Sequence, residues 1–186
     1  MKKILFGVFI SALLIACNND AKEEVKPVTT DAPAADAKKT VDEILDMSEA
    51  DQAKNSLVAF SKGDVAGMTA NYDDNAKYYW SGGDSLVGKK AIQDYYTGRW
   101  KLIETLKITG QVVLPVKVNT SQTPQHALGK WVLVWSDLEV TYKNGKTIKF
   151  WTHADYHYND AGKVDVAIQY IDRHQLMEAT KDLMPK

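Results

Sequence analysis

The chain has 186 residues, a formal net charge of -1 and 25% charged residues. A nucleic-acid-binding domain carries a strongly basic face, so this even charge balance argues against a nucleic-acid partner. The length predicts a single compact domain, because one domain typically takes roughly 100 to 200 residues.

The first 16 residues have the pattern of a bacterial export signal. Lys2 and Lys3 precede an uncharged run that is too short to span a bilayer, which takes about 20 residues. The run ends in Leu14-Ile15-Ala16-Cys17, which resembles a lipobox, and Cys17 is the only cysteine of the chain. We therefore predict a signal peptide at 1–16 and acylation of Cys17, since two or more acyl chains give stable membrane anchoring.

Residues 17–40 predict a flexible tether. Asn, Asp, Lys, Glu, Ala and Pro dominate there, so the segment cannot bury enough apolar surface to fold. A flexible chain of about 23 residues reaches roughly 25 to 30 Å. Lys22-Glu23-Glu24 resembles export signals of surface lipoproteins in some Gram-negative bacteria, which favours the cell envelope, at the outer membrane or the cell surface. The folded domain is expected to occupy residues 41–186.

Helical spacing of apolar residues predicts three helices in the first half of this domain. The first begins at Ser48 and ends before Gly63, and Asp64 caps a second, shorter helix. The turn-forming residues 73–75 are expected to end the second helix. The third helix follows Gly88 and carries a broad stripe of aromatic and aliphatic side chains.

After residue 105 the hydrophobic pattern changes to the period of two that is typical of strands. Predicted strands in this part cover residues 106–118, 128–142, 146–158 and 163–173, and a short helix or tail follows at 175–184. A further brief strand is predicted earlier, at 76–80, between the second and third helices. Helices that precede a run of antiparallel strands indicate an α+β domain, in which the helices cover one face of a curved sheet.

Several short segments occur in the order that one protein family shows. They are residues 63–68, 72–76, 88–92, 162–164 and 170–172. Their order and spacing resemble the SnoaL-like branch of the nuclear transport factor two-like superfamily, over roughly residues 48–177. The resemblance implies a cystatin-like α+β roll, a cone of helices and curved antiparallel sheet that encloses one pocket. It implies no single reaction, because the family includes isomerases, dehydratases, cyclases, an epoxide hydrolase and many non-enzymatic binders.

The Asn144-Gly145 pair predicts a two-residue hairpin, which fixes the pairing of the two strands that it joins. In that register Asp137 lies opposite Thr152. A four-residue loop after the next strand then places Thr152 opposite Gln169. The row formed by Asp137, Thr152 and Gln169 is expected to face the pocket.

In the limonene epoxide hydrolase branch of the family, two strands carry patterns resembling Arg-x-Asp and Arg-Asp-Tyr-Phe-Asp. Here Trp135-Ser136-Asp137 stands in the place of the first, and Ile168-Gln169-Tyr170-Ile171-Asp172 in the place of the second. Asp137 therefore remains, whereas Trp135 and Gln169 replace an arginine and a second aspartate. A carboxylate pair bridged by arginine needs all three charges, so these replacements argue against epoxide hydrolysis.

Asp137 is the candidate catalytic residue, as a general base on a carbon acid. The alternative is a hydrogen-bonded polar residue at the mouth of the pocket or at a bulge. The candidate ligand-binding residues have aromatic or hydrogen-bonding side chains and are Tyr79, Trp80, Tyr96, Trp100, Trp135, Thr152 and Gln169. Aromatic residues at such spacing are also typical of plain core, from which a pocket in this fold is built.

His153, Asp155 and His157 alternate along one predicted strand and therefore share one face. Two histidines and a carboxylate are possible ligands for zinc or iron. Three successive same-face residues of one strand surround a small ion poorly, and no fourth ligand is evident, so we expect no metal and no cofactor. This face is expected to point outward. The opposite face, expected to line the pocket, carries Phe150, Thr152, Ala154 and Tyr156.

Three functions remain open on the sequence. The first is a lipid-anchored envelope protein whose pocket binds a small, partly apolar ligand without chemistry. The second is an isomerase, dehydratase or cyclase that uses Asp137 as its base. The third is an interaction module that forms a homodimer, or meets another envelope protein, through the outer face of the sheet.

Overall fold

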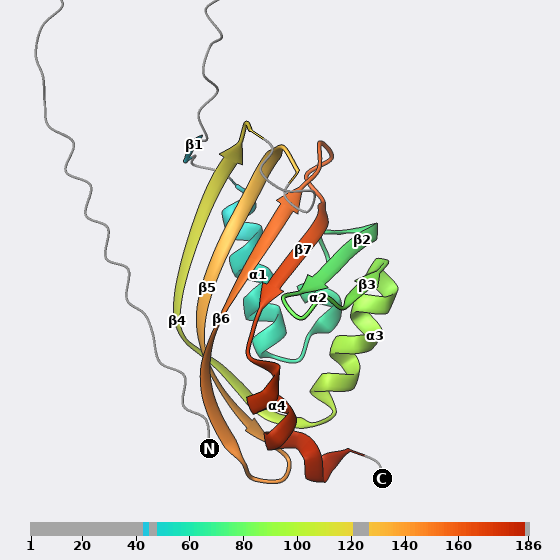
Figure 1. Cartoon of the computed structure of the whole chain (residues 1–186), viewed down its shortest axis with the longest axis vertical. Helices are drawn as coiled ribbons and strands as arrows, with labels where there is room; N and C mark the ends of the chain where they lie inside the picture. The colour runs from blue at the N-terminus through green and yellow to red at the C-terminus, as the bar shows by residue number, and fades with distance from the viewer. Residues whose placement is uncertain (1–42, 45–47, 121–126, 185–186) are drawn as a thin grey trace, which may run out of the picture. The chain divides into compact units, whose positions relative to one another are not determined.

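A computed structural model describes residues 43–44, 48–120 and 127–184, and all of these lie in one compact unit, Lys38–Lys186. The described strands form one sheet in the order β1-β4-β5-β6-β7-β2-β3 (Figure 1). They are β1 (Glu43–Ile44), β2 (Tyr72–Trp80), β3 (Ser85–Val87), β4 (Ile103–Val118), β5 (Gly129–Tyr142), β6 (Thr147–Tyr158) and β7 (Val164–Tyr170). The helices are α1 (Glu49–Ser61), α2 (Val65–Met68), α3 (Lys89–Trp100) and α4 (Arg173–Thr180), with a final 3-10 turn, η1 (Lys181–Leu183).

Helices α1, α2 and α3 lie on one side of the curved sheet, and α4 lies beside the hairpin that joins β5 to β6 (Figure 1). This arrangement confirms the expected α+β fold with helices covering one face of a bent sheet. The third helix follows Gly88 as predicted, whereas the short strand β3 was not predicted. Within the described part of the chain, no helix is both long and apolar enough to cross a membrane.

Strand β2 is longer than predicted and contains the residues that were expected to form a turn. Asp73 Oδ1 accepts a hydrogen bond from the backbone N–H of Asn75 at 2.9 Å, a local bond that favours turns. This hydrogen bond lies where the register of β2 against β7 shifts, between Tyr72 and Lys77. These residues therefore form an irregularity inside a strand, and the predicted turn is wrong. The β2–β7 pair is parallel, in contrast to the antiparallel sheet that was expected.

The hairpin between β5 and β6 has a three-residue loop, 143–145, where a two-residue loop was predicted. Tyr142 N donates to Lys146 O at 2.9 Å, and Gly145 N donates to Tyr142 O at 2.8 Å. Gly145 has a φ of 80°, a left-handed conformation that glycine adopts at little cost. A three-residue hairpin whose last loop residue is left-handed is a common alternative to the two-residue turn.

This loop shifts the register of β5 against β6 by one residue from the prediction. Ser136 pairs with Thr152, and Asp137 pairs with Trp151. A shift of one residue exchanges the two faces of a strand, so the predicted pair of Asp137 with Thr152 is wrong. Gln169 pairs with Ala154 and not with Thr152, an offset of two that leaves Gln169 on the predicted face.

Two apolar clusters fill the space between the helices and the sheet. One gathers around Ile92 of α3 and Val134 of β5, and the other around Leu138 of β5. Phe60 of α1 and Trp100 of α3 pack against both clusters, with ring centroids 5.9 Å apart in an edge-to-face contact. These two rings therefore join the halves of the core.

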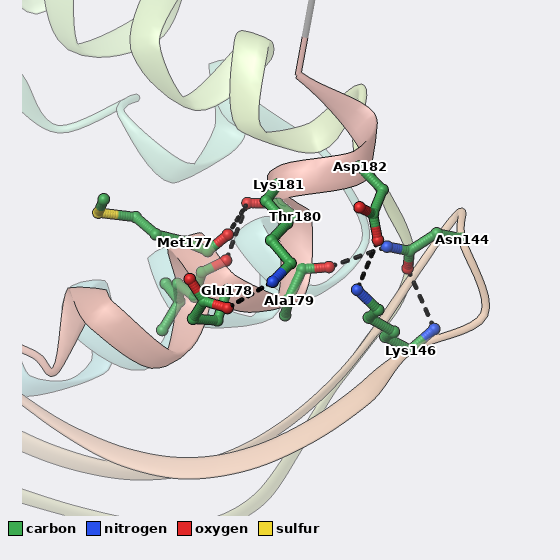
Figure 2. Close-up of polar contacts among 9 residues, drawn as sticks. Asn144, Lys146, Met177, Glu178, Ala179, Thr180, Lys181 and Asp182 are labelled. Carbon is green, nitrogen blue, oxygen red and sulfur yellow. Dashed lines mark hydrogen bonds and ion pairs between the residues drawn. The ribbon is translucent and has the colours of Figure 1, made fainter.

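The last helix docks onto the β5–β6 hairpin (Figure 2). Asn144 Nδ2 donates to the backbone oxygen of Ala179 at 2.9 Å, and Asn144 Oδ1 accepts from the backbone N–H of Lys146 at 3.1 Å. Lys146 Nζ also lies 2.7 Å from a carboxylate oxygen of Asp182, in an exposed ion pair. Ala179 is buried in the second apolar cluster. The predicted terminal helix therefore exists, and it closes one end of the core.

Candidate ligand-binding site

Two small cavities lie between the helices and the inner face of the sheet. The tyrosine cavity has a volume of about 50 Å³ and is lined by Tyr78 and Tyr156. The arginine cavity has a volume of about 70 Å³ and is lined by Arg99 and Arg173. Four residues line both cavities, namely Phe60, Tyr96, Leu138 and Gln169. The cavities are therefore neighbouring compartments that share a wall.

Gln169 accepts several hydrogen bonds at its side-chain oxygen in this shared wall. Tyr78 Oη donates to Gln169 Oε1 at 3.0 Å, and Trp80 Nε1 donates to it at 3.1 Å. Tyr96 Oη donates to Tyr78 Oη at 2.5 Å and lies 3.3 Å from the same amide oxygen. Because a phenol has one proton to donate, Tyr96 donates to Tyr78 and Tyr78 donates to Gln169.

The neighbours of Gln169 determine which way its amide points. The indole nitrogen of Trp80 is only a donor, so the amide oxygen must face it. The amide nitrogen then donates to Thr152 Oγ1 at 3.4 Å, and this hydroxyl donates to the backbone oxygen of Tyr170 at 3.0 Å. Buried Ser136 lines the tyrosine cavity, as Thr152 and Gln169 do. An amide N–H and two hydroxyls thus provide polar contacts among aromatic and aliphatic walls.

The tyrosines of this site are neutral at physiological pH. Burial raises the pKa of Tyr78 well above its ordinary value of 10.0, and the neighbouring tyrosines add to the effect. Burial likewise raises the pKa of Tyr96, and it raises the pKa of Tyr156 to about 12. A phenol with such a pKa donates hydrogen bonds but does not serve as a base near neutral pH.

Charged side chains reach one of the two cavities. Among the described residues, no Asp, Glu, His, Lys or Arg lines the tyrosine cavity, whereas Arg99 and Arg173 line the arginine cavity. Arg173 pairs with Asp84, which holds the pKa of that carboxyl below its ordinary value. The described walls of both cavities therefore contain no carboxylate or imidazole that could act as a general base.

Asp137 and Trp135, two of the predicted site residues, lie on the outer face of the sheet. Asp137 is exposed, and its carboxylate covers Gly110 so closely that a Cβ there would lie 2.5 Å from Oδ2. Trp135 is 37% exposed, and its ring centroid lies 4.4 Å from that of His153. The inward position expected for the general base belongs to Ser136, because the one-residue register shift reversed the faces of β5.

Four other predicted residues meet at the cavities. Trp80 lines the arginine cavity, Thr152 lines the tyrosine cavity, and Tyr96 and Gln169 line both. The hydrogen bonds described above join all four through Tyr78 or through the Gln169 amide. The structure therefore brings together half of the residues that the sequence indicated.

Tyr79 and Trp100 lie outside both cavities. Side chains alternate along a strand, so Tyr79 points to the opposite face of β2 from Tyr78 and Trp80. The same alternation could have identified Tyr78, once Trp80 was assigned to the pocket. Trp100 packs in the core, and its Nε1 is buried without a hydrogen-bond partner in the described part of the structure.

The alternating histidines and aspartate of β6 line neither cavity and form two distinct pairs. His153 Nε2 lies 2.5 Å from Asp155 Oδ1. His157 Nδ1 lies 2.5 Å from Asp165 Oδ1, and its Nε2 lies 3.0 Å from the backbone oxygen of Leu128. Within residues 43–44, 48–120 and 127–184, no group of three or more His, Cys, Asp or Glu side chains is arranged to hold a metal ion.

The fold has solved relatives in several bacteria. A candidate polyketide cyclase from Pseudomonas putida is 16% identical, covers 72% of this chain and 98% of its own, and has a TM-score of 0.57. A candidate isomerase from Bacillus subtilis is 20% identical, covers 73% of this chain and 96% of its own, and has a TM-score of 0.54. An NTF2-like protein of unknown function from Burkholderia pseudomallei is 13% identical, covers 72% and 98%, and has a TM-score of 0.54.

At these identities the solved structures show a shared fold alone. No curated protein sequence matches the chain. The family model for the SnoaL-like domain matches residues 53–166, which is more than half of the chain. The match spans α1 to β7, the elements that build most of both cavities. The chain therefore belongs to the SnoaL-like domain family.

Proposed function

We propose that the tyrosine and arginine cavities bind one small, partly apolar ligand across their shared wall. The observation that carries this proposal is the Gln169 amide, which is held by Tyr78, Trp80 and Thr152 at the junction of two aromatic compartments. A few fixed polar groups among apolar walls are typical of sites that bind small molecules.

The size of the cavities limits the ligand. At about 50 and 70 Å³, each is smaller than the roughly 150 Å³ of an apolar cavity that admits benzene. A ligand with one ring must therefore occupy both compartments or displace a side chain of the wall. Leu138 is the aliphatic residue that lines both cavities, so it would contact a ligand that occupies both.

Binding without chemistry is the better supported activity. The solved structures of a candidate cyclase and a candidate isomerase share the fold at low identity, which transfers no reaction to this chain. Proton abstraction needs a base within hydrogen-bond reach of the bound ligand. Asp137 is exposed on the outer face, so we do not assign it that role.

Calorimetric titration of the full-length protein with the neutral probe hydrocinnamide tests this proposal. The probe has one aromatic ring, a short chain and a polar end. We expect saturable binding that Leu138→Phe abolishes, because the larger side chain occupies space in the two cavities that Leu138 lines. Leu128→Phe adds the same atoms at an exposed position and should leave binding unchanged. Absence of binding to the wild type, or equal binding to Leu138→Phe, would contradict the proposal.

We also propose that the domain is anchored in the bacterial cell envelope through acylated Cys17, after removal of 1–16. Cys17 and the tether 17–40 lie outside the described residues, so this proposal rests on the lipobox-like sequence. Cys17→Ser should move the protein from the membrane fraction to the soluble fraction and stop incorporation of labelled palmitate. Asn18→Ala is the matched control. Membrane binding that survives Cys17→Ser would refute the anchor.

Self-association through the sheet is a second candidate function. On the outer face of the sheet, Trp151 is 67% exposed, and Trp135 and Tyr170 are each 37% exposed. Exposed aromatic side chains gathered on one face are typical of protein contact sites. Sedimentation of the wild type and of Trp151→Lys tests it. A dimer that the substitution dissociates would support this function, and a wild-type monomer at high concentration would exclude it.

A further inference from the structure

The two arginines of the chain lie at the same cavity. The sequence has 23 lysine and arginine residues, and Arg99 and Arg173 are the only arginines among them. Both line the arginine cavity, although Arg99 belongs to α3 and Arg173 begins α4. Lysine serves at the other 21 basic positions. Arginine differs from lysine in its planar fork of donors, which matches a carboxylate with two parallel hydrogen bonds.

One of the two charges is already compensated. Arg173 forms an ion pair with Asp84, and its guanidinium carbon lies 5.4 Å from the centre of the Trp80 ring. These contacts hold Arg173 against the wall of the cavity. Its charge is therefore matched within the protein before any ligand binds.

Arg99 has no such partner among the described residues. Its side chain is half-buried, and the nearest acid on the same helix, Asp94, is paired with Lys90 at 2.8 Å. Arg99 lies close enough to Tyr142 for its charge to oppose the burial that raises the pKa of that phenol. Within the described lining of the arginine cavity, the positive charge of Arg99 therefore has no acidic partner, and it lies beside the aromatic rings of Tyr95 and Phe150.

We propose that the ligand carries a carboxylate, which pairs with Arg99 in the arginine cavity while its apolar part lies against the aromatic wall. This inference rests on the proposed function, since it names the chemical class of ligand for the same site. A single uncompensated charge fits a monoanion. A half-buried, charge-assisted hydrogen bond is roughly twice as strong as a neutral one, so the carboxylate end would dominate selectivity.

The test compares two nearly isosteric probes, hydrocinnamate and its neutral amide hydrocinnamide, by calorimetric titration of the full-length protein. We expect the wild type to bind the carboxylate about tenfold more tightly than the amide. Arg99→Met should remove that preference, so that the two probes bind with equal affinity. Arg99→Lys should retain part of the preference, because it keeps the charge and loses the fork.

Lys163→Met is the matched control, since it removes one positive charge from an exposed position that lines neither cavity. It should leave both affinities unchanged. Equal affinity of the wild type for the two probes, or a carboxylate preference that survives Arg99→Met, would overturn this inference and leave the proposed function standing. Failure of the wild type to bind either probe would overturn both.

Discussion

Trp80 donates its indole N–H to the side-chain oxygen of Gln169 at 3.1 Å. The two residues are also direct partners in the parallel pairing of β2 with β7, although 89 positions separate them in the chain. Backbone pairing places their side chains on the same inward face, where the indole orients the amide. The orientation of the central polar group of the site is thus set by a strand pair that joins the two halves of the domain.

Gln169→Leu should destabilise the fold more than an ordinary surface substitution. The leucine leaves Trp80 Nε1 and Tyr78 Oη without their acceptor, and each buried donor that loses its partner costs about 1–3 kcal/mol. We expect the free energy of unfolding to fall by about 2 kcal/mol or more in a denaturant titration. Gln175→Leu, at an exposed position of α4, is the matched control, and equal effects of the two substitutions would argue against the network.

Stability should fall at alkaline pH because buried tyrosines stay protonated in the folded state. The folded pKa of Tyr156 is about 12, above the value of 10.0 expected for the unfolded chain. Its contribution is fully present below pH 10 and is lost as the pH rises toward 12, since the unfolded state then binds fewer protons. Tyr78 and Tyr96, which have raised pKa values, act in the same direction.

Tyr156→Phe isolates one part of this dependence. Between pH 10 and about 12, the substitution should make the fall in unfolding free energy shallower by about 1.4 kcal/mol per pH unit, the value for one proton. Chemical unfolding at a series of pH values measures the slope. An unchanged slope would show that Tyr156 ionises alike in the folded and unfolded states.

Ser136 and Asp137 provide a direct test of which face of β5 lines the tyrosine cavity. Ser136→Leu should block binding of hydrocinnamide, because the side chain is 3% exposed and lines that cavity. Asp137→Leu, at the next residue, should leave binding unchanged because its side chain lies on the outer face. The opposite result would restore the register in which Asp137 faces the pocket.

Asn144→Ala should loosen the last helix. The substitution removes the hydrogen bond from Asn144 Nδ2 to the backbone of Ala179, which holds α4 on the hairpin. We expect a loss of about 1 kcal/mol and faster amide hydrogen exchange within α4. Lys146→Ala breaks only the exposed ion pair with Asp182 and should change neither quantity measurably. Equal exchange in both variants would mean that Asn144 does not hold the helix.

Local patterns predicted most of the fold. The alternation along β6 placed Thr152, Ala154 and Tyr156 on one face, and all three line the tyrosine cavity, because side-chain alternation is a property of the strand itself. The face of β5 depended on the length of one turn. Asn144-Gly145 suits a two-residue hairpin and also a three-residue one in which Gly145 is left-handed, and the chain adopts the second.

The composition of the site depended on contacts that no local pattern contains. The parallel pairing of β2 with β7 brings Tyr78 and Trp80 to Gln169, and it follows from the closure of the whole sheet. Arg99 and Arg173 meet at one cavity because α4 returns to cover the end of the core. The rarity of arginine in this chain was visible in the sequence, but its meaning depended on that return.

The most direct test of the central claim is mass spectrometry of the small molecules released when the full-length protein, purified from its native host, is denatured. We predict that the wild type and Leu128→Phe release one small, partly apolar compound in an amount close to that of the protein. Leu138→Phe, whose larger side chain occupies space in both cavities, should release none. Recovery of the same compound from Leu138→Phe, or of no compound from the wild type, would contradict a ligand-binding site between the helices and the sheet.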